Sequence, residues 1–190
     1  MTVTAQSSLI DVAFEVGGAL RRHGISAVLT GGACVALHTD GTYASRDLDF
    51  VLQRLTSVTQ LDTALGELGF RRDGNQYRHP DIPWYVEFPP GPLAIGGDCS
   101  LHPTRLTRGD LSVVALSPTE SCMDRLAAFY HWRDRQSLAL AVRVARHRVV
   151  DFRRISAWSK AEGQSQSHRE FLAEIQTGRS RPTRRRKPAR

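Results

Sequence analysis

The chain has 190 residues, of which 41% are hydrophobic, and a formal net charge of +7. This length is enough to bury a core, so we expect one domain with a small helical addition. The sequence contains no run of about 18 apolar residues and does not open with a basic segment followed by an apolar one. These absences argue against a membrane span and a signal peptide, and we expect a cytoplasmic protein without a membrane partner.

The positive charge is concentrated at the C-terminus. Residues 179–190 contain seven Arg and Lys residues and no acidic residue, so they account for the whole net charge of +7. The segment also contains prolines and no large apolar side chain, a composition that cannot form a packed core. We expect a disordered basic tail over residues 178–190.

Hydrophobic periodicity predicts alternating helices and strands in the first two thirds of the chain. The predicted elements are a helix over 7–23, a strand over 26–30, a glycine turn at 31–32, a short helix over 33–40, a strand over 47–52, a helix over 58–70 and strands over 83–89 and 111–117. Such an order is typical of an α/β (α+β) fold, with a small mixed sheet flanked by helices.

The last third of the ordered chain reads as helical. It begins with a capping box in which Ser117 is the N-cap, Pro118 the first helical residue and Glu120 the third. Helical periodicity then continues to about residue 177. We therefore divide the chain into a core over 1–116, a helical part over 117–177 and the basic tail over 178–190.

Two aspartates follow the glycine turn on a strand that otherwise reads as buried. In a strand, alternate residues share a face, so Asp47 and Asp49 point to one side while Leu48 and Phe50 point to the other. Glu87 projects from a later strand in the same way. If the two strands are neighbours, about 4.8 Å apart, the carboxylates of Asp47, Asp49 and Glu87 converge.

Carboxylates this close repel one another unless a cation lies among them. A hard divalent cation with oxygen ligands fits this need, and Mg²⁺ (or Mn²⁺) fits best, because it binds through few carboxylates and completes its shell with water and phosphate oxygens. We therefore predict a metal site formed by Asp47, Asp49 and Glu87.

The glycine pair supplies a complementary phosphate site. A strand that turns at Gly31-Gly32 into a helix exposes backbone N–H groups at the positive helix end, and the missing side chains allow a phosphate to approach. A nucleoside triphosphate held there would reach a metal on the aspartates. The reaction class that this geometry implies is nucleotidyl transfer, with Glu87 helping to activate an attacking hydroxyl. Ser45 and Arg46 lie next to the aspartates in sequence and are candidate phosphate contacts.

These motifs resemble a known superfamily. The pair Gly31-Gly32, the run Asp47-Leu48-Asp49-Phe50 and a later strand carboxylate are similar to the signature of the DNA polymerase beta-like nucleotidyltransferases. The closer resemblance is to the AbiEii-like minimal nucleotidyltransferase toxins of bacterial abortive-infection and toxin–antitoxin systems, and it covers roughly residues 26–147. The resemblance implies the nucleotidyltransferase fold with a helical C-terminal part.

The same resemblance implies further residues and partners. In the segment 122–146, Arg125 takes the place of the family's lysine and Asp134 that of its aspartate, and both are carried over as nucleotide-binding residues. The resemblance implies an RNA acceptor, such as the 3′ end of tRNA, and a cognate antitoxin. The chain departs from the pattern in having a long segment between the glycines and Asp47, no serine directly after the glycines, and arginine at 125.

Other interpretations of these residues remain open from the sequence. The aspartates could be a charge pair on an edge strand, the glycines only a turn, and Arg125 with Asp134 a structural ion pair between helices. The whole protein could be a non-catalytic module that binds nucleic acid or a protein partner. It could also be a transferase that acts on a hydroxyl of a protein or a small molecule.

Overall fold

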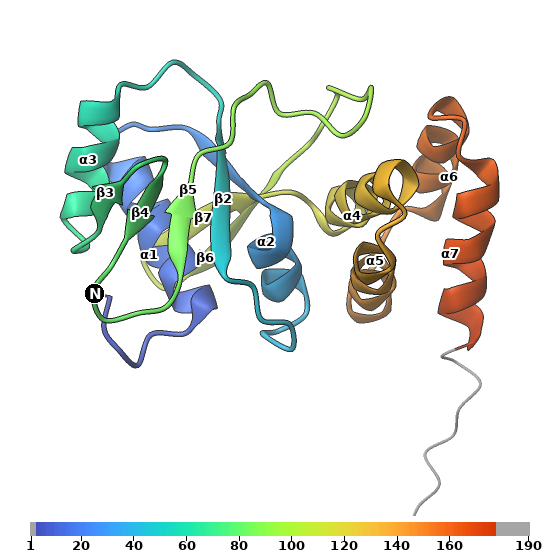
Figure 1. Cartoon of the computed structure of the whole chain (residues 1–190), viewed down its shortest axis with the longest axis horizontal. Helices are drawn as coiled ribbons and strands as arrows, with labels where there is room; N and C mark the ends of the chain where they lie inside the picture. Colours follow the sequence, from blue (N-terminus) through green and yellow to red (C-terminus); the bar gives the residue numbers. More distant parts are fainter. Residues whose placement is uncertain (1–2, 178–190) are drawn as a thin grey trace, which may run out of the picture.

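The computed structural model describes residues 3–177, and its centre is a seven-stranded mixed sheet. The strand order is β3-β4-β5-β2-β1-β7-β6 (Figure 1). β2 runs antiparallel to β1 and parallel to β5, and β1 runs parallel to β7. The strands are β1 Ala27–Thr30, β2 Asp47–Leu52, β3 Arg71–Asp73, β4 Gln76–Arg78, β5 Tyr85–Glu87, β6 Thr104–Arg108 and β7 Leu111–Ala115.

Helices flank the sheet and then form a group of their own beside it. In Figure 1 the last four helices stand together at one end of the molecule, and α2 packs against α4 and α5 at the junction. The helices are α1 Leu9–Arg22, α2 Gly31–His38, α3 Val58–Gly66, α4 Pro118–Trp132, α5 Arg135–His147, α6 Phe152–Ala161 and α7 Ser165–Thr177.

Local sequence signals explain where several helices start. Capping boxes open α1, α3 and α4, and in each the N-cap serine accepts a hydrogen bond from the third helical residue while that residue's side chain returns to the N-cap backbone. The capping box predicted at Ser117 is therefore confirmed. Helix α2 differs, because its N-cap Thr30 makes no side-chain hydrogen bond to the helix.

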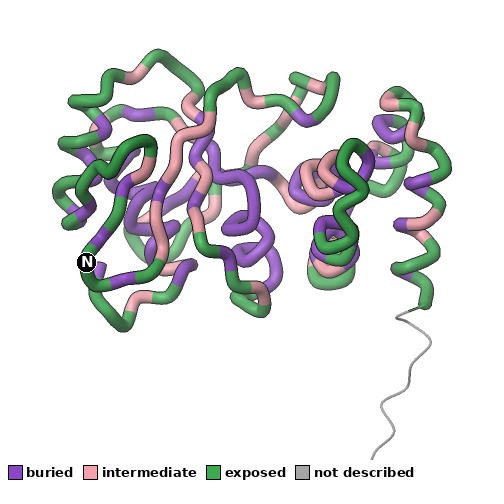
Figure 2. Tube along the Cα trace, in the orientation of Figure 1, coloured by how far each residue is buried: buried purple, intermediate pink, exposed green. Residues whose placement is uncertain are grey.

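One hydrophobic core runs from the sheet into the helical group. Leu48 and Phe50 of β2 are 0% and 1% exposed, and Phe129 of α4 and Phe171 of α7 belong to the same buried cluster. Figure 2 shows buried chain through the central strands, α1 and α2, whereas the β3–β4 end of the sheet is largely exposed. The site described below lies at the centre of the sheet, on β2 and its neighbours β5 and β1.

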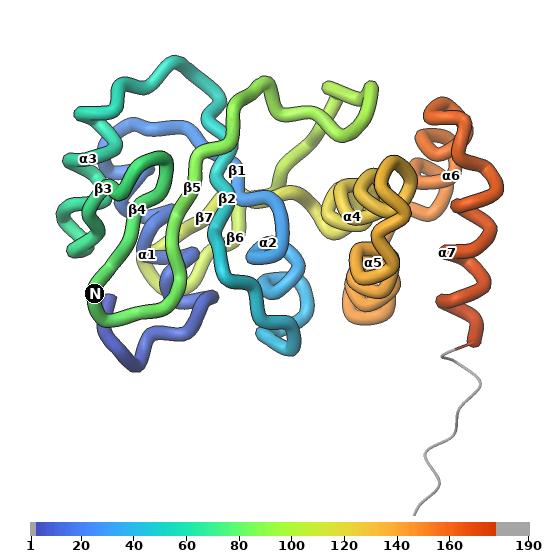
Figure 3. The backbone as a smooth tube through the Cα atoms, viewed as in Figure 1, coloured from blue at the N-terminus to red at the C-terminus, as the bar shows by residue number. Residues whose placement is uncertain are grey.

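A long connection between β5 and β6 joins the sheet to the last helices. Figure 3 shows this segment arching from β5 toward the helical group before it returns to β6. The Gly97 amide donates to Glu162 Oε1 at 2.7 Å, and Trp158 Nε1 donates to the Ile95 carbonyl at 3.2 Å. The connection is therefore tied to α6 and its C-terminal end.

The predicted mixed α/β fold is confirmed, and its details differ in part. Strand 47–52 has the predicted bounds, α2 begins at Gly31 instead of after the glycines, and the region after residue 117 consists of α4 to α7. The strands β3, β4 and β6 were not predicted. The division at residue 117 falls between β7 and α4 and stays a prediction, and the basic tail lies outside the described residues. No helix within residues 3–177 has both the length and the apolar character to cross a membrane.

Candidate active site

The carboxylates predicted from the sequence lie side by side on the sheet. In the parallel pairing of β2 with β5, Asp49 is opposite Glu87 and Asp47 is opposite Tyr85. Paired residues on adjacent strands project from the same face, so all of these side chains share one face. Val86, like Leu48, is fully buried on the other face. The adjacency on which the predicted site depends is therefore present.

The electrostatics of this cluster are unfavourable without a cation. Burial, together with the negative charges of Asp47 and Glu87, raises the pKa of Asp49 to about 7. Arg125 acts in the opposite direction, but its effect on this pKa is smaller. Near neutral pH a substantial fraction of the Asp49 carboxyl is therefore protonated. A bound cation would favour its ionised form.

The glycine pair lies directly against these carboxylates. Gly31 has φ +65°, and a Cβ at this position would lie 2.3 Å from Asp49 Oδ2. A Cβ at Gly32 would lie 2.4 Å from the hydroxyl oxygen of Ser45. The space freed by the glycines is thus bordered by protein side chains, and its first role is to let Asp49 and Ser45 approach the helix.

The start of α2 lies against the same carboxylates and lacks a side-chain cap. The first N–H groups of a helix have no partner within the helix, and Thr30 provides no side-chain cap here. Thr30 is also opposite Asp49 in the pairing of β1 with β2. A phosphate beside Asp49 would therefore meet backbone donors at a positive helix end.

Ser45 and Arg46 occupy different environments. The hydroxyl of Ser45, a buried residue, donates to Asp47 Oδ1 at 2.8 Å and so orients that carboxylate. Arg46 is exposed, and its carbonyl accepts a hydrogen bond from the Tyr85 amide at 3.4 Å. Ser45 is thus part of the carboxylate cluster, whereas the only contact found for Arg46 within residues 3–177 is this backbone pairing.

Arg125 and Asp134 make different contacts. Arg125 Nη2 contacts Asp124 Oδ2 at 2.6 Å, and Arg125 interacts electrostatically with Asp49. Asp134 is the N-cap of α5, where it accepts from the Gln136 amide at 2.9 Å and from the Ser137 hydroxyl at 2.6 Å.

Within residues 3–177 Arg125 and Asp134 form no ion pair within 4 Å, and the pKa of Asp134 is lowered most by its hydrogen bond with Ser137 and least by the positive charge of Arg125. The carboxylate that contacts Arg125 is that of its neighbour Asp124. Asp134, by contrast, holds the first turn of α5. Arg125 therefore belongs to the electrostatics of the site, and Asp134 has a local structural explanation.

The sequence interpretation missed one neighbour of the cluster. Gln76 of β4 is paired with Glu87 across the sheet, and its side-chain amide donates to Glu87 Oε1 at 2.5 Å. The signal that could have found it is the turn at Gly74-Asn75, since Gly next to Asn or Asp between short strands favours a hairpin. Gly74 has φ +61°, as such a turn requires.

The three carboxylates are chemically suitable ligands for a hard divalent cation, but they are not arranged as a complete metal site. Asp47, Asp49 and Glu87 offer only carboxylate oxygens, the ligands that Mg²⁺ and Mn²⁺ prefer. Within residues 3–177, however, no group of at least three His, Cys, Asp or Glu side chains is arranged closely enough to hold a metal ion.

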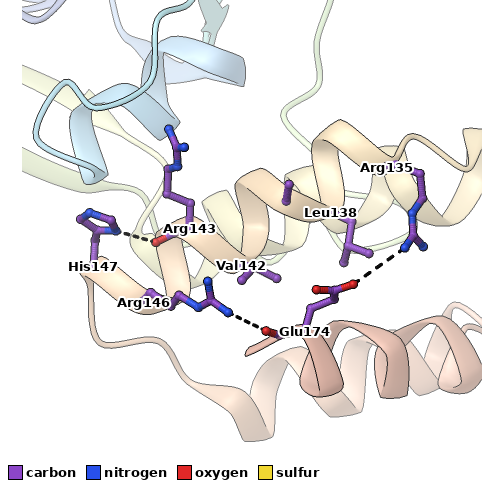
Figure 4. Close-up of a pocket in the computed structure, with 8 residues that line it drawn as sticks. Arg135, Leu138, Val142, Arg143, Arg146, His147 and Glu174 are labelled. Atoms are coloured by element: carbon purple, nitrogen blue, oxygen red, sulfur yellow. Dashed lines mark hydrogen bonds and ion pairs between the residues drawn. The ribbon is translucent and has the colours of Figure 1, made fainter. Parts of the chain in front are cut away.

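A separate groove lies on the helical group. It has a volume of about 380 Å³ and runs between α5 and α7 (Figure 4). Its lining residues are Arg135, Leu138, Ala139, Val142, Arg143, Arg146, His147 and Glu174. The groove contains none of the residues predicted for the metal or nucleotide site.

The cations of this groove differ in their partners. Arg135 contacts Glu170 and Glu174. Arg143 Nη1 donates to the Thr42 carbonyl at 2.8 Å, and Arg146 Nη2 donates to the Glu174 carbonyl at 2.6 Å. In the part of the chain that the structure describes, the hydrogen bonds of Arg143 and Arg146 go to backbone carbonyls and neither side chain forms an ion pair within 4 Å, although Glu174 lines the same groove.

The mixed sheet and its flanking helices have the fold of nucleotidyltransferase-like proteins. The chain is similar to a solved structure of an antigenic nucleotidyltransferase-like protein from Paracoccidioides brasiliensis, with a TM-score of 0.61 and 18% identity over 93% of this chain and 90% of the other. The antibiotic-resistance factor ANT(2″)-Ia gives a TM-score of 0.46 and 14% identity over 90% and 95%, a likeness too weak for functional argument. No protein-family model matches the sequence. No curated protein matches it either.

Proposed function

We propose that this protein is a metal-dependent nucleotidyltransferase that moves a nucleoside monophosphate from a nucleoside triphosphate to an acceptor hydroxyl. The observation that carries the proposal is the position of Asp49, which lies between Thr30 and Glu87 in the sheet register and against Gly31 at the start of α2. A divalent metal and a triphosphate are the partners that these carboxylates and backbone donors would jointly bind.

Each residue has a defined part in the proposed reaction. Asp47 and Asp49, with Glu87, would hold the metal, which when bound would supply charge neutralisation at the phosphates. Ser45 orients Asp47, and Arg125 adds positive charge near Asp49. The acceptor oxygen forms a bond to the α-phosphorus while the bond to the departing pyrophosphate breaks, and Glu87 receives the proton of the hydroxyl.

For the acceptor we propose RNA, with the 3′ end of tRNA as the first candidate. The cationic side chains of Arg143 and Arg146 in the groove, which donate to backbone carbonyls, support this choice, as do the seven cations within residues 179–190. A toxin role with a cognate antitoxin rests on the sequence resemblance to the AbiEii-like proteins. Localisation in the cytoplasm is part of the same proposal.

The test is transfer of label from each α-³²P nucleoside triphosphate to total cellular RNA in the presence of Mg²⁺ or Mn²⁺. We expect label on RNA with the wild-type protein and none with Asp49→Asn. Asp110→Asn is the matched control, because Asp110 is an exposed aspartate outside the cluster. Equal transfer by wild type and Asp49→Asn would refute the assignment of the site.

The remaining outcomes separate the other interpretations. RNA binding that is unaffected by Asp49→Asn, with no nucleotide binding in the presence of Mg²⁺, would identify a non-catalytic binding protein. Release of pyrophosphate only when a protein extract or a small-molecule fraction replaces RNA would move the acceptor to a protein or small-molecule hydroxyl.

A further inference from the structure

The β3–β4 hairpin presents a row of polar side chains on the same face as the carboxylates. Asp73 is opposite Gln76 in the pairing of β3 with β4, and Gln76 is opposite Glu87 in the pairing of β4 with β5. Because directly paired residues project from one face, this row continues across the sheet to Asp49. The hairpin thus extends the active-site face outward from Glu87.

Hydrogen bonds in this row are donated from Arg78 to Gln76 and from Gln76 to Glu87. Gln76 Nε2 donates to Glu87 Oε1 at 2.5 Å, and Arg78 Nη2 donates to Gln76 Oε1 at 2.5 Å. A guanidinium has donors only, so the oxygen of the Gln76 amide must face Arg78 and its NH₂ group must face Glu87. Arg78 therefore fixes which end of the amide meets the carboxylate.

Arg78 is itself held on several sides. Its Nε lies 3.2 Å from Asp73 Oδ2, and its guanidinium carbon lies 4.9 Å from the centre of the Tyr85 ring. These contacts restrict an exposed side chain that would otherwise sample many rotamers. Asp73, Arg78 and Gln76 together form a support that ends on Glu87.

We propose that Gln76 is a positioning residue for Glu87, and that Arg78 keeps the Gln76 amide in the orientation that this task requires. The inference rests on the proposed function, because it assumes that Glu87 receives the acceptor proton. One oxygen of Glu87 is occupied by Gln76, which leaves the other to face the hydroxyl or the metal. Fixing a catalytic carboxylate in this way removes the cost of ordering it during the reaction.

A double-mutant cycle tests the proposal. Gln76→Leu should lower kcat about tenfold, the scale of one charge-assisted hydrogen bond, with little change in KM for the nucleotide. In the Glu87→Gln background the same substitution should have almost no effect, because the residue it positions has lost its function. Equal effects of Gln76→Leu in both backgrounds would overturn the proposal.

Two further variants keep the kinetic test specific. Gln53→Leu is the matched control, since Gln53 Nε2 donates to the Val51 carbonyl at 2.9 Å outside the carboxylate row, and its kcat should stay at the wild-type value. Arg78→Leu should lower kcat in the same direction as Gln76→Leu, and the effect should also vanish in the Glu87→Gln background. Full activity of Arg78→Leu would remove Arg78 from the proposal.

An NMR measurement decides the hydrogen bond independently of activity. In ¹⁵N-labelled protein, the side-chain NH₂ signal that disappears in Gln76→Leu belongs to Gln76. Its downfield proton should shift upfield and exchange faster with water in Glu87→Ala, while the Gln53 signals stay unchanged. An unchanged Gln76 signal would overturn the proposal. A wild-type protein without any transfer activity would instead refute the proposed function, and this measurement would still show whether Gln76 orients Glu87.

Discussion

The carboxylate of Asp49 fills the space that a side chain at Gly31 would need. A Cβ at Gly31 would lie 2.3 Å from Asp49 Oδ2, closer than any side chain could tolerate, and the backbone of Gly31 has φ +65°. The glycine is therefore required twice, once for its conformation and once for the carboxylate beside it. This relationship connects the start of α2 to the proposed metal site.

The first prediction concerns this contact. Gly31→Ala should lower the free energy of unfolding by about 1–2 kcal/mol, because an alanine at positive φ is strained. It should also displace Asp49 and reduce transfer strongly. Urea unfolding and the labelled-nucleotide assay measure the two effects.

Gly66→Ala is the control for this substitution. Gly66 is the last residue of α3, its φ is not positive, and a Cβ there would meet nothing within 4 Å. Alanine at this position should leave activity unchanged and stability equal or slightly higher. Normal activity in Gly31→Ala would contradict the link between this glycine and the position of Asp49.

The second prediction is a pH dependence of stability without metal. Because the pKa of Asp49 is raised from 3.8 to about 7, the folded protein binds more protons than the unfolded chain between these values, and its stability falls as pH rises through this range. Asp49→Asn removes this loss. The free energy of unfolding of Asp49→Asn relative to that of the wild type should therefore increase by about 1–3 kcal/mol between pH 4 and pH 8. A constant difference in urea unfolding across this range would show that Asp49 has an ordinary pKa.

The third prediction concerns the metal. Mg²⁺ should raise the Tm of the wild-type protein, and more at pH 8 than at pH 5, because only the ionised carboxylates are ligands. The increase should disappear in Asp47→Asn and Asp49→Asn and persist in Asp110→Asn. An increase of the same size in all variants would place the cation elsewhere.

The fourth prediction separates structure from binding at Asp134. Its side chain caps α5, so Asp134→Ala should cost about 1 kcal/mol of stability. Asp134→Ser, which retains a capping oxygen, should restore most of it. Nucleotide affinity, measured by calorimetry, should be the same in both variants. A loss of affinity in the stable serine variant would restore the nucleotide-binding role expected from the family resemblance.

The fifth prediction tests the RNA acceptor. Charge reversal by Arg143→Glu with Arg146→Glu should weaken RNA binding and flatten the slope of log affinity against log salt, since each lost phosphate contact removes about 0.7 from that slope for a single strand. Arg72→Glu, a reversal on the exposed strand β3, is the control. Removal of residues 179–190 should also weaken RNA binding and flatten the salt slope. Turnover of the truncated protein should recover at saturating RNA. Unchanged affinity in every variant would argue against RNA.

The centre of the fold could be predicted from the sequence because its signals are strong there. Strand 47–52 alternates buried and polar residues, which fixes the faces of Asp47, Asp49 and Phe50 before any pairing is known. The capping box at Ser117 is similarly local. Predicting that Asp49 and Glu87 are adjacent needed only the assumption that β2 and β5 are neighbours. The pairing of these strands in the structure confirms that assumption.

The edges of the sheet could not be predicted, because their residues carry no hydrophobic pattern. All residues of β3 are exposed, and β6 has mostly exposed residues, so pairing with a neighbour is what makes them strands. The contact between Gly31 and Asp49 depends on the meeting of two segments 18 positions apart, with a geometry that no spacing rule gives. Gln76 was missed because the turn at Gly74-Asn75 was not used to predict the β3–β4 hairpin, and the pairing of Gln76 with Glu87 then depends on the register of β4 with β5.

The helical group is fastened to the loop that precedes the carboxylate strand. Arg143 of α5 holds the Thr42 carbonyl, and Arg148 at the end of α5 contacts Asp40 at 2.5 Å. The same loop continues through Ser45 to Asp47. A ligand in the α5–α7 groove that breaks the hydrogen bond from Arg143 to Thr42 would loosen this loop and so change the orientation of Asp47, which we propose as a metal ligand. If the proposed acceptor binds in this groove and the proposed metal binds at Asp47, this stretch of backbone would link the two events, and each ligand should alter the affinity of the other by the same factor.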